Sequence, residues 1–456
     1  VRRLLGLRYL LQNMSRGEDN VAPATYAQIK AEAQFLRALY YSYLIELYGD
    51  VPLITDVLTL ETGQQPRTPK SEVVDFILKE YTEAAENLPS TNNPTSGRAT
   101  KGAALALKAR TALYNERWQD AISASQAVIA MEGTEYIIED DYSKLFKYEG
   151  QTSKEVIFSV QYLLGTKVHA LYRLFGSRNA LAHTNKKPAY QLADTWECID
   201  GKQIDKSPMF DPKHPYENRD PRLGYTLAVS GSEFLGFQFE THGDSTKCWN
   251  YMTNQRVDNL EATHAYATFT GICWRKYANI EDKDALNDCD MNTILIRYPE
   301  VLLTYAEAKI KAGEIDASVL EAINKVRQRP SVKMPPITTT DPNELFYAVA
   351  RERKYEFSGE GLRLFDIRRW KIAETVMNQP LLGRMKKSYP DKAPRIDEWG
   401  TAFYEGIPIA ESGESADFKM RVVDIRKFDK NRDYLWPIPY IERQTNPNLT
   451  QNPNYE

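Results

Sequence analysis

Cysteine and histidine are scarce in this chain, and the few present are scattered. Its 456 residues include only four cysteines and five histidines. The cysteines form no CxxC pair and the histidines no HExxH motif, so the sequence indicates neither a zinc site nor thioredoxin-type redox chemistry. The spacing of Cys198, Cys248, Cys273 and Cys289 is compatible with two disulfides and equally with free buried thiols.

The chain also lacks a long apolar run, an excess of basic residues and the common catalytic motifs. No stretch approaches the roughly 18 apolar residues that span a membrane. The net charge of −4 and a pI of about 6.0 give no electrostatic basis for binding nucleic acid. P-loop, GxGxxG and GxSxG motifs are absent. The acidic run EDKDALNDCD, residues 281–290, has neither the glycine nor the glutamate that an EF-hand requires. We therefore predict no catalytic residue, no metal site and no cofactor.

Apolar and aromatic residues are abundant enough for a large folded core. Hydrophobic residues make up 42% of the chain and charged residues 26%, which is typical of a globular protein. The 28 tyrosines and 7 tryptophans can fill a core, and they also suit a surface that stacks on ligands. The opening VRRLLGLRYLL is too short for a signal peptide, so we interpret the start as a cut inside a longer protein.

Helical periodicity dominates residues 1–148. Apolar residues recur at steps of four and one between residues 28 and 48, and Gly49 and Pro52 predict the end of that helix. A second helix is predicted over residues 71–88, with Ser71 as its N-cap. Residues 99–114 and 118–131 are predicted to form a helical hairpin. We therefore predict an N-terminal helical scaffold over residues 1–148.

The hairpin has a counterpart 197 residues later in the chain. Apolar or small residues fall at the same spacing in both copies, which are Leu105, Ala109, Leu113, Trp118, Ile122, Ser125, Ile129 and Leu302, Ala306, Ile310, Ile315, Val319, Ala322, Val326. Small residues at Ala109 and Ala306 let two antiparallel helices approach closely, as in tetratricopeptide-type pairs that stack on neighbours. Two unrelated hairpins that share generic spacing are the alternative. We predict a C-terminal helical scaffold over residues 293–378.

Residues 149–292 lack helical periodicity. Short strand-like runs at residues 156–161, 223–230 and 271–277 are separated by Gly, Asn, Asp and Thr. Long loops inside a compact protein usually serve function. We therefore predict a loop-rich segment with short strands that carries the ligand-binding face.

The densest charge lies in RERKYEFSGEGLRLFDIRRW, residues 351–370. Glu352 and Glu356 are four residues apart on one helix face, a spacing that would suit a catalytic acid and base. As many arginines are interleaved with the carboxylates, and they would lower both pKa values instead of raising one. We interpret the block as an ion-pair network and keep glycoside hydrolysis as a remote alternative.

Residues 379–456 are predicted to be extended loops that end in a packed tail. The closing sequence YLWPIPYIERQTNPNLTQNPNYE begins at residue 434, and prolines at 437 and 439 exclude a helix there. Aromatic and aliphatic residues interleave with these prolines, which predicts an extended tail pressed onto an apolar surface. A disordered tail is the alternative.

These phrases resemble the SusD/RagB family, whose chains typically end in a "WPIP … NPxLxQNPGY"-like signature. EAQFLRALYYSYLIELYGDVPLI, residues 32–54, resembles the family's "EARFLRAxYYFxLVxLYGDVPL". Further matches follow in family order: TWECIDGKQI from residue 195, NRDPRL from 218, GICWRKY from 271, RYPEVLLTYAEAKIKAG from 297, and the charged block from 351. Pro330 and Ser331 depart from the family's "VRxRAG", so the turn after that helix is expected to differ.

The resemblance implies a mainly α, SusD-like fold in which tetratricopeptide-type helix pairs form a scaffold for a loop-rich insertion. It also implies an outer-membrane lipoprotein of Bacteroidetes-type bacteria, displayed on the cell surface, that binds a nutrient and catalyses nothing. Its partner would be a TonB-dependent transporter of the SusC/RagA type. Membrane contact is expected only through a lipid-anchored cysteine in a leading segment that this chain does not contain.

A glycan site combines a flat aromatic ring, which packs on the apolar face of a sugar, with planar hydrogen-bonding groups for its hydroxyls. The central segment supplies the predicted ligand contacts, which are Tyr172, Arg178, Asn179, Trp249, Asn250, Tyr251 and Tyr266. Trp196, Tyr225 and Trp274 are interpreted as core residues. We predict an oligosaccharide ligand of unspecified sugar; a peptide ligand on the same scaffold and a cytosolic helical-repeat adaptor are the alternatives.

Overall fold

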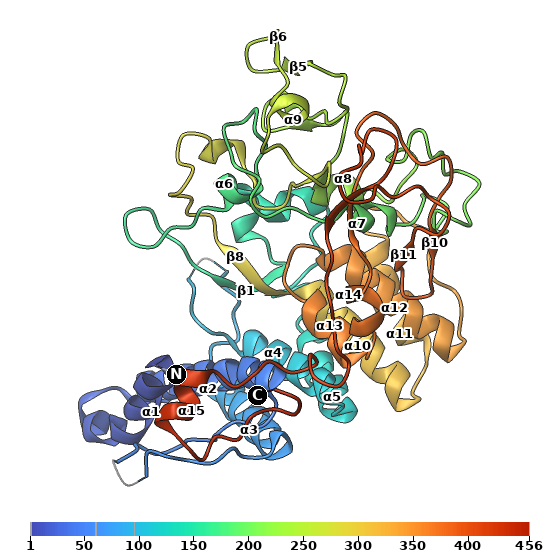
Figure 1. The fold of residues 1–456 in the computed structure, drawn as a ribbon. Coiled ribbons are helices and arrows are strands. Elements are labelled where there is room, and N and C mark those ends of the chain that lie inside the picture. The colour runs from blue at the N-terminus through green and yellow to red at the C-terminus, as the bar shows by residue number, and fades with distance from the viewer. Residues whose placement is uncertain (1, 60–61, 95, 456) are drawn as a thin grey trace.

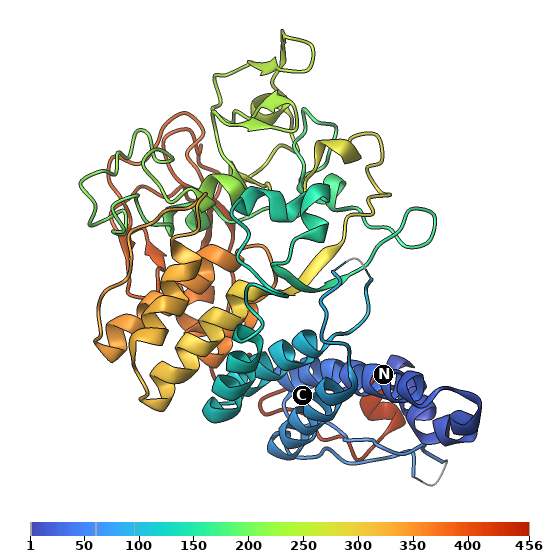
Figure 2. The ribbon, with the colours of Figure 1, turned by 180° about the vertical axis from the view of Figure 1, so that it is seen from behind.

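The computed structural model describes residues 2–59, 62–94 and 96–455, with the side chains of residues 2 and 3 left aside. The N-terminal helices lie together at one end of the molecule, and a second group of helices, α10 to α14, lies beside them (Figures 1 and 2). The short strands and loops of the central segment occupy the opposite end. The predicted fold class, mainly α with paired helices and a loop-rich insertion, is confirmed.

The first helical group forms where the sequence places its apolar residues and caps. Its elements are α1 (Arg2–Asn13), η1 (Met14–Asn20), α2 (Pro23–Tyr48), α3 (Lys70–Asn87), α4 (Lys101–Tyr114) and α5 (Trp118–Ile129). Thr100 caps α4 by accepting a hydrogen bond from the Ala103 N–H at 3.2 Å. The predicted N-cap at Ser71 is wrong, because α3 begins one residue earlier and the Asp50 carboxylate accepts the Lys70 N–H at 2.8 Å.

The two predicted helical hairpins pack directly against each other. The second pair is α10 (Tyr298–Ala312) and α11 (Ala317–Arg327), and α10 lies against α5 of the first pair. Ala109 and Ala306 are buried, as close helix packing requires. Arg110 of α4 donates to the Glu300 carboxylate of α10 at 2.5 and 2.6 Å, which joins the pairs with a buried bidentate ion pair. The remaining helices of this group are α12 (Pro342–Phe357), α13 (Arg363–Arg369) and α14 (Ala373–Met377).

The central segment contains short antiparallel strand pairs. Strand β1 (Val156–Val160) pairs with β8 (Thr293–Arg297), β2 (Leu227–Ala228) pairs with β7 (Cys273–Trp274), and a four-stranded sheet has the order β3 (Glu233–Phe234), β4 (Phe237–Gln238), β5 (Lys247–Asn250), β6 (Gln255–Asp258). Short helical turns connect them, which are η2 (Tyr142–Phe146), η3 (Tyr148–Thr152), α6 (Leu171–Phe175), α7 (Tyr190–Asp194), α8 (Arg222–Thr226), α9 (Leu260–Thr263) and η4 (Ile280–Asp282). The strand predicted over residues 223–230 is wrong in its first half, which is helix α8. The four-part division of the chain stays a prediction.

The C-terminal residues return to the first helical group. Strand β9 (Leu381–Gly383) pairs with β12 (Arg421–Asp424), β10 (Arg395–Ile396) pairs with β11 (Ala402–Phe403), and α15 (Tyr440–Thr445) follows the prolines. The Trp436 N–H donates to the Leu47 carbonyl at 2.7 Å, and its ring meets Tyr48 edge-on at 6.1 Å. The Asn452 amide donates to the Tyr48 carbonyl at 3.0 Å. The tail is therefore held against the end of α2, extended as predicted except for the short helix α15.

The state of the cysteines, which the sequence left open, is answered within the described part of the chain. All four cysteines are buried free thiols. No helix there is both long and apolar enough to cross a membrane.

Candidate functional site

A cavity of about 820 Å³ opens in the central segment. Its residues come from η2, α8, the β3–β4 turn, the β5–β6 turn and the stretch from β7 to η4, so the chain assembles it from five separate places. Ligand pockets in proteins commonly measure about 300–1,000 Å³ and combine an apolar lining with a few placed polar groups. This space is large enough for part of an oligosaccharide. We call it the aromatic cavity.

Aromatic side chains line this cavity. Phe146, Tyr225, Phe234 and Tyr251 all contribute to it; Phe146 and Phe234 are only 3% and 2% exposed and form its inner wall, whereas Tyr225 and Tyr251 are more open. Tyr251 is 45% exposed, and its backbone N–H donates to the Gly236 carbonyl at 2.9 Å, which fixes the β5–β6 turn. Gly236 has a φ of +81°, a left-handed conformation that favours glycine, and a Cβ atom there would lie 2.9 Å from the Met252 side chain. The ring of Tyr251 is thereby presented at the mouth of the cavity.

The charged groups around the cavity are balanced. The Arg275 guanidinium lies 5.4 Å from the centre of the Phe234 ring and donates to the Ser232 hydroxyl at 3.1 Å. Burial lowers the pKa of Arg275, and the neighbouring carboxylate of Glu233 opposes that shift. Lys147 adds a second cation, and exposed Glu233 and Glu281 add two carboxylates. The opening therefore carries little net charge.

The floor of the cavity is tied to the scaffold through Lys276. This side chain is 1% exposed and donates to the Glu360 carboxylate at 2.8 Å and to the Glu356 carbonyl at 3.1 Å. Burial lowers the pKa of Lys276 to about 8, against the attraction of Glu360. The ammonium is thus already committed to protein partners and supports the site without being available to a ligand.

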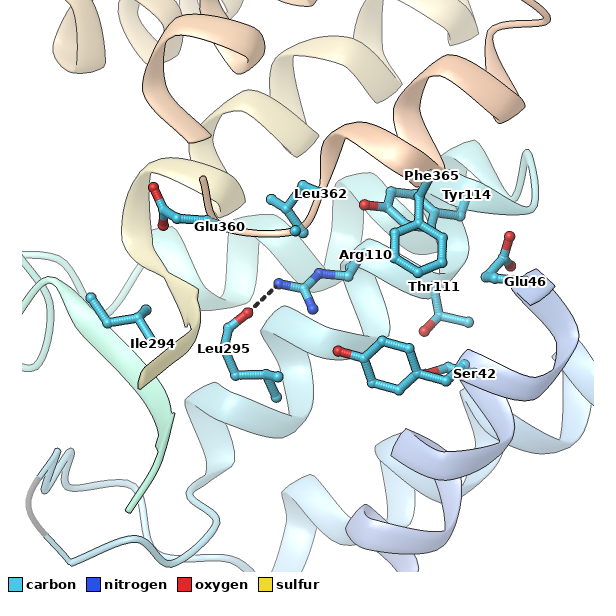
Figure 3. Close-up of a pocket in the computed structure, with 12 residues that line it drawn as sticks. Ser42, Glu46, Arg110, Thr111, Tyr114, Ile294, Leu295, Glu360, Leu362 and Phe365 are labelled. Carbon is cyan, nitrogen blue, oxygen red and sulfur yellow. Dashed lines mark hydrogen bonds between the residues drawn. The ribbon is translucent and has the colours of Figure 1, made fainter. Parts of the chain in front are cut away.

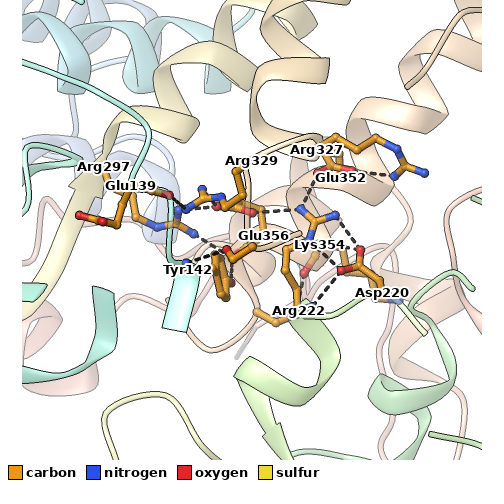
Figure 4. Close-up of polar contacts among 12 residues, drawn as sticks. Glu139, Tyr142, Asp220, Arg222, Arg297, Arg327, Arg329, Glu352, Lys354 and Glu356 are labelled. Atoms are coloured by element: carbon orange, nitrogen blue, oxygen red, sulfur yellow. Dashed lines mark hydrogen bonds and ion pairs between the residues drawn. The ribbon is translucent and has the colours of Figure 1, made fainter. Parts of the chain in front are cut away.

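A buried ion-pair network extends from this floor (Figure 4). Glu356 accepts hydrogen bonds from Arg222, Arg297 and Arg329 at 3.0, 2.5 and 2.7 Å. Burial alone would raise the pKa of Glu356, but the three arginines outweigh it and hold that pKa well below its ordinary value. Glu352 accepts from Arg222 at 2.5 Å and is 1% exposed. Neither carboxylate can reach a substrate, so the charged block is the ion-pair network that its interleaved arginines predicted.

A second cavity, of about 220 Å³, lies between α2, α4 and the turn before α13 (Figure 3). Its most polar wall is Arg110, whose guanidinium donates to the Leu295 carbonyl at 2.7 Å as well as to Glu300. Because that guanidinium is already paired with Glu300 and the space is small, we assign no ligand to this cavity.

Family comparison agrees with this architecture. Residues 154–455 match a family model described as the SusD family, and residues 6–113 match one described as starch-binding and associating with the outer membrane. The chain belongs to the SusD family. It is 26% identical over 451 residues to SusD-like protein P2 of Formosa agariphila, a match that covers 94% of this chain and 74% of the relative.

Solved structures of the SusD family share the fold. A SusD-like carbohydrate binding protein from Bacteroides fragilis superposes with a TM-score of 0.81 at 31% identity, covering 98% of this chain and 84% of that one. A laminarin binding SusD-like protein superposes with a TM-score of 0.65 at 20% identity, covering 99% and 84%, and this similarity concerns the fold alone.

The seven predicted ligand contacts of this SusD-family chain lie at different places in the structure. Tyr251 lines the aromatic cavity. Tyr172 has to be withdrawn, because its side chain is 0% exposed and its hydroxyl donates to the Ala180 carbonyl at 3.1 Å inside a small core. Asn250 is 9% exposed, and its side-chain oxygen accepts the N–H groups of Met252 and Thr253. Asn250 therefore shapes the turn that presents Tyr251.

The other four predicted residues lie outside the aromatic cavity. Asn179 holds α9 by donating to the Asp258 carbonyl at 2.8 Å and accepting the Leu260 N–H at 3.0 Å. Arg178 donates to the Tyr266 carbonyl at 3.0 Å, which leaves the Tyr266 ring 68% exposed at the surface. Trp249 is half-buried in β5.

Sequence reasoning missed several residues of the cavity. Phe146, Phe234 and Arg275 carry no motif that distinguishes them from core residues. Tyr225 was interpreted as core but is half-buried and lines the cavity, and its neighbour in sequence, exposed Gly224, is the one signal of an open surface there. Trp196 is fully buried as predicted, whereas Trp274 is half-buried.

Proposed function

We propose that this protein captures oligosaccharides at the bacterial cell surface and binds them in the aromatic cavity. The observation that carries the proposal is the cavity of about 820 Å³ lined by Phe146, Tyr225, Phe234 and Tyr251. Aromatic rings pack on the C–H faces of sugars, and nearby hydroxyl and guanidinium groups satisfy sugar hydroxyls. The carbohydrate-binding name of the similar Bacteroides fragilis structure supports the same ligand class.

A peptide ligand is the second candidate, and the charge of the site argues against it. A peptide site needs unpaired charges or free backbone groups to hold the termini and side chains of its ligand. Here Lys147 and Arg275 face Glu233 and Glu281 around the opening, and Lys276 is committed to Glu360. A nearly neutral aromatic opening favours an uncharged sugar.

The experiment compares two exposed tyrosines that differ in place. Tyr251→Ala removes a ring from the aromatic cavity, and Tyr266→Ala removes a more exposed ring from outside it. Covering about 60 Å² of the Tyr251 ring is worth about 1.5 kcal/mol, so Tyr251→Ala should weaken binding about tenfold. The readout is affinity electrophoresis or calorimetry with a panel of oligosaccharides and peptides. Binding of peptides alone, or equal losses in both variants, would contradict the proposal.

We further propose that the bound glycan is not cleaved. The carboxylates closest to a catalytic pairing, Glu352 and Glu356, are 1% and 0% exposed and bound by arginines. The test is prolonged incubation with the glycan that binds, followed by chromatography of the products. Release of shorter sugars that disappears in Glu352→Gln would show hydrolysis and overturn this part.

The final part of the proposal concerns delivery. We propose that the chain is held at the outer membrane by an N-terminal lipid anchor and passes its ligand to a TonB-dependent transporter of the SusC/RagA type. Membership of the SusD family and the match to a model for outer-membrane-associated proteins support this role. Co-purification of a transporter with the full-length protein from detergent-solubilised membranes tests it, and recovery from the cytosol would favour a helical-repeat adaptor instead.

A further inference from the structure

A second opening lies on another face of the central segment. Its volume is about 300 Å³, and it is lined by residues of α9 and the loop after it, by the stretch after β9, and by β12. It continues into a shallower space of about 690 Å³ bordered by residues 410–416, because Lys386 and Arg421 line both. None of its lining residues is shared with the aromatic cavity. We call the combined space the basic cleft.

Cations predominate in the narrower part of the basic cleft, whereas the wider part is bordered by exposed Glu411 and by Glu414, which is paired with Lys419 at 2.8 Å. Arg384, Lys386 and Arg421 line its narrower part, where Glu261 is the only carboxylate among the lining residues. Within the described residues none of these three cations has a carboxylate within 4.0 Å, whereas the adjacent Lys387 pairs with Asp244 and Asp417 at 3.2 and 3.4 Å. The local sequence therefore neutralises one lysine and leaves its neighbour and both arginines without an anion.

The strand pairing brings two of these cationic residues close in the fold. Strands β9 and β12 pair so that Arg421 lies opposite Gly383, the residue before Arg384. Gly383 also lets the backbone of Phe269 pack against β9, because a Cβ atom there would lie 2.1 Å from the Phe269 carbonyl oxygen.

Arg384 is the clearest case. Its side chain is 4% exposed, and its partners are all neutral: the Met385 carbonyl at 2.8 Å and the hydroxyls of Ser230 and Thr241 at 2.7 and 3.0 Å. Its remaining terminal nitrogen, Nη2, is buried without a hydrogen-bond partner. A buried guanidinium without a carboxylate is costly, and its uncompensated field extends into the neighbouring cleft.

An aromatic ring completes the cleft. Phe269 lines it, and both the Arg421 guanidinium and the Lys187 ammonium lie over this ring, at 4.3 and 4.4 Å from its centre. Lys187 is thus a fourth cation at the same place. Glu261 is the carboxylate that faces them; burial raises its pKa, and one of its oxygens accepts the Arg178 backbone N–H. A ring beside several cations matches a ligand that has an apolar face and carries a negative group.

We propose that the basic cleft binds the anionic group of an acidic sugar, a uronate carboxylate or a sulfate ester, with Lys386 and Arg421 as its direct contacts and Arg384 as a buried source of positive potential. The inference rests on the proposed function in taking the ligand to be a glycan. It adds that the glycan is acidic and is held at a site separate from the aromatic cavity.

The experiment uses matched acidic and neutral probes with the whole chain. The probes are polygalacturonate, its fully methyl-esterified form, a sulfated galactan and a neutral β-glucan, each run in affinity electrophoresis. Removing two partly exposed cations in Lys386→Gln/Arg421→Gln should weaken binding of an acidic probe about tenfold and leave the neutral probes unchanged. Lys79→Gln removes one positive charge from an exposed helix position outside the cleft and is the control.

The results separate this inference from the proposed function. Preference for polygalacturonate or the sulfated galactan that disappears in the double variant and weakens with added salt supports the basic cleft. Which of the two acidic probes binds identifies the anionic group. Neutral binding that depends on Tyr251 while no acidic probe gains affinity would leave the proposed function intact and overturn the cleft. Binding of polyglutamate as tightly as the acidic polysaccharides would also overturn it, because the site would then recognise negative charge alone and not a sugar.

Discussion

Replacing Glu356 by glutamine should measure how much the buried ion-pair network stabilises the molecule. In the described part of the chain six cationic side chains and six carboxylates form one connected set, which are Arg222, Lys276, Arg297, Arg327, Arg329, Arg351 and Glu155, Glu197, Asp220, Glu352, Glu356, Glu360. Glu356→Gln keeps the size of the side chain and leaves this balanced set with one excess positive charge.

The expected cost follows from what each arginine retains. Breaking a buried pair typically costs about 3–5 kcal/mol, because an uncompensated charge stays behind. Arg222 keeps Asp220 and Glu352, while Arg297 and Arg329 both keep Glu155. No arginine is fully stranded, so we expect the lower end of the range, a loss of about 3 kcal/mol in the free energy of unfolding.

Urea unfolding at neutral pH, followed by tryptophan fluorescence, measures this loss. Lys79→Gln serves as the control, since Lys79 is 74% exposed and its pair with Glu83 should contribute less than about 0.5 kcal/mol. A loss below about 1 kcal/mol for Glu356→Gln would refute the reasoning, because the charge would then be solvated or the network would relax around its absence.

Three further predictions concern the tail, a buried acid and the thiols. Asn452→Ala should lower the free energy of unfolding by about 2–3 kcal/mol and expose the tail to proteases, because the Asn452 side chain donates to the Tyr48 and Trp436 carbonyls and accepts from Arg67. The control Gln444→Ala, at an exposed position, should do neither. A tail that stays protease-resistant in Asn452→Ala would contradict this role. Burial raises the pKa of Asp194 to about 6, against its bond from Tyr404 and the attraction of Arg219, so the folded state binds the proton more tightly than the unfolded state. Stability relative to Asp194→Asn should therefore fall by up to about 3 kcal/mol as the pH rises from about 4 to about 6 and stay level above; parallel pH curves for the two proteins would refute it. The four buried cysteines should react with a thiol reagent only after unfolding, and fast labelling of the native protein would show that the central segment opens.

The sequence predicts the helical scaffold well, because its signals are local. Periodic apolar residues and caps locate α2, α4 and α5, and the shared spacing of the two hairpins correctly indicates similar helix pairs. That spacing does not reveal that α5 packs against α10, because contact between distant segments is set by the whole chain. The strand predicted over 223–230 fails at α8 for the same reason: Arg222 is drawn into the buried network, and this tertiary contact outweighs local preference.

The candidate site was less predictable. Its aromatic residues come from five places in the chain, and nothing in the local sequence distinguishes Tyr251, which lines the cavity, from Tyr172, which is buried. Both lie in loop-rich stretches, where the side chains are expected to be exposed. Only the packing of the surrounding turns decides which ring faces solvent, and that information is not contained in composition or spacing.

The antiparallel pairing of β1 with β8 has a consequence for how such molecules diversify. It places Val160 beside Thr293, so that the chain leaves and re-enters the helical frame at adjacent positions. The entropic cost of closing such a loop grows only with the logarithm of its length, by about 0.6 kcal/mol for each doubling. Glu197, Arg222 and Lys276 tie this segment to the frame through buried ion pairs. Loops within residues 161–292 that lie away from those pairs can therefore lengthen or shorten at little expense to the frame, and ligand preference can change there between relatives.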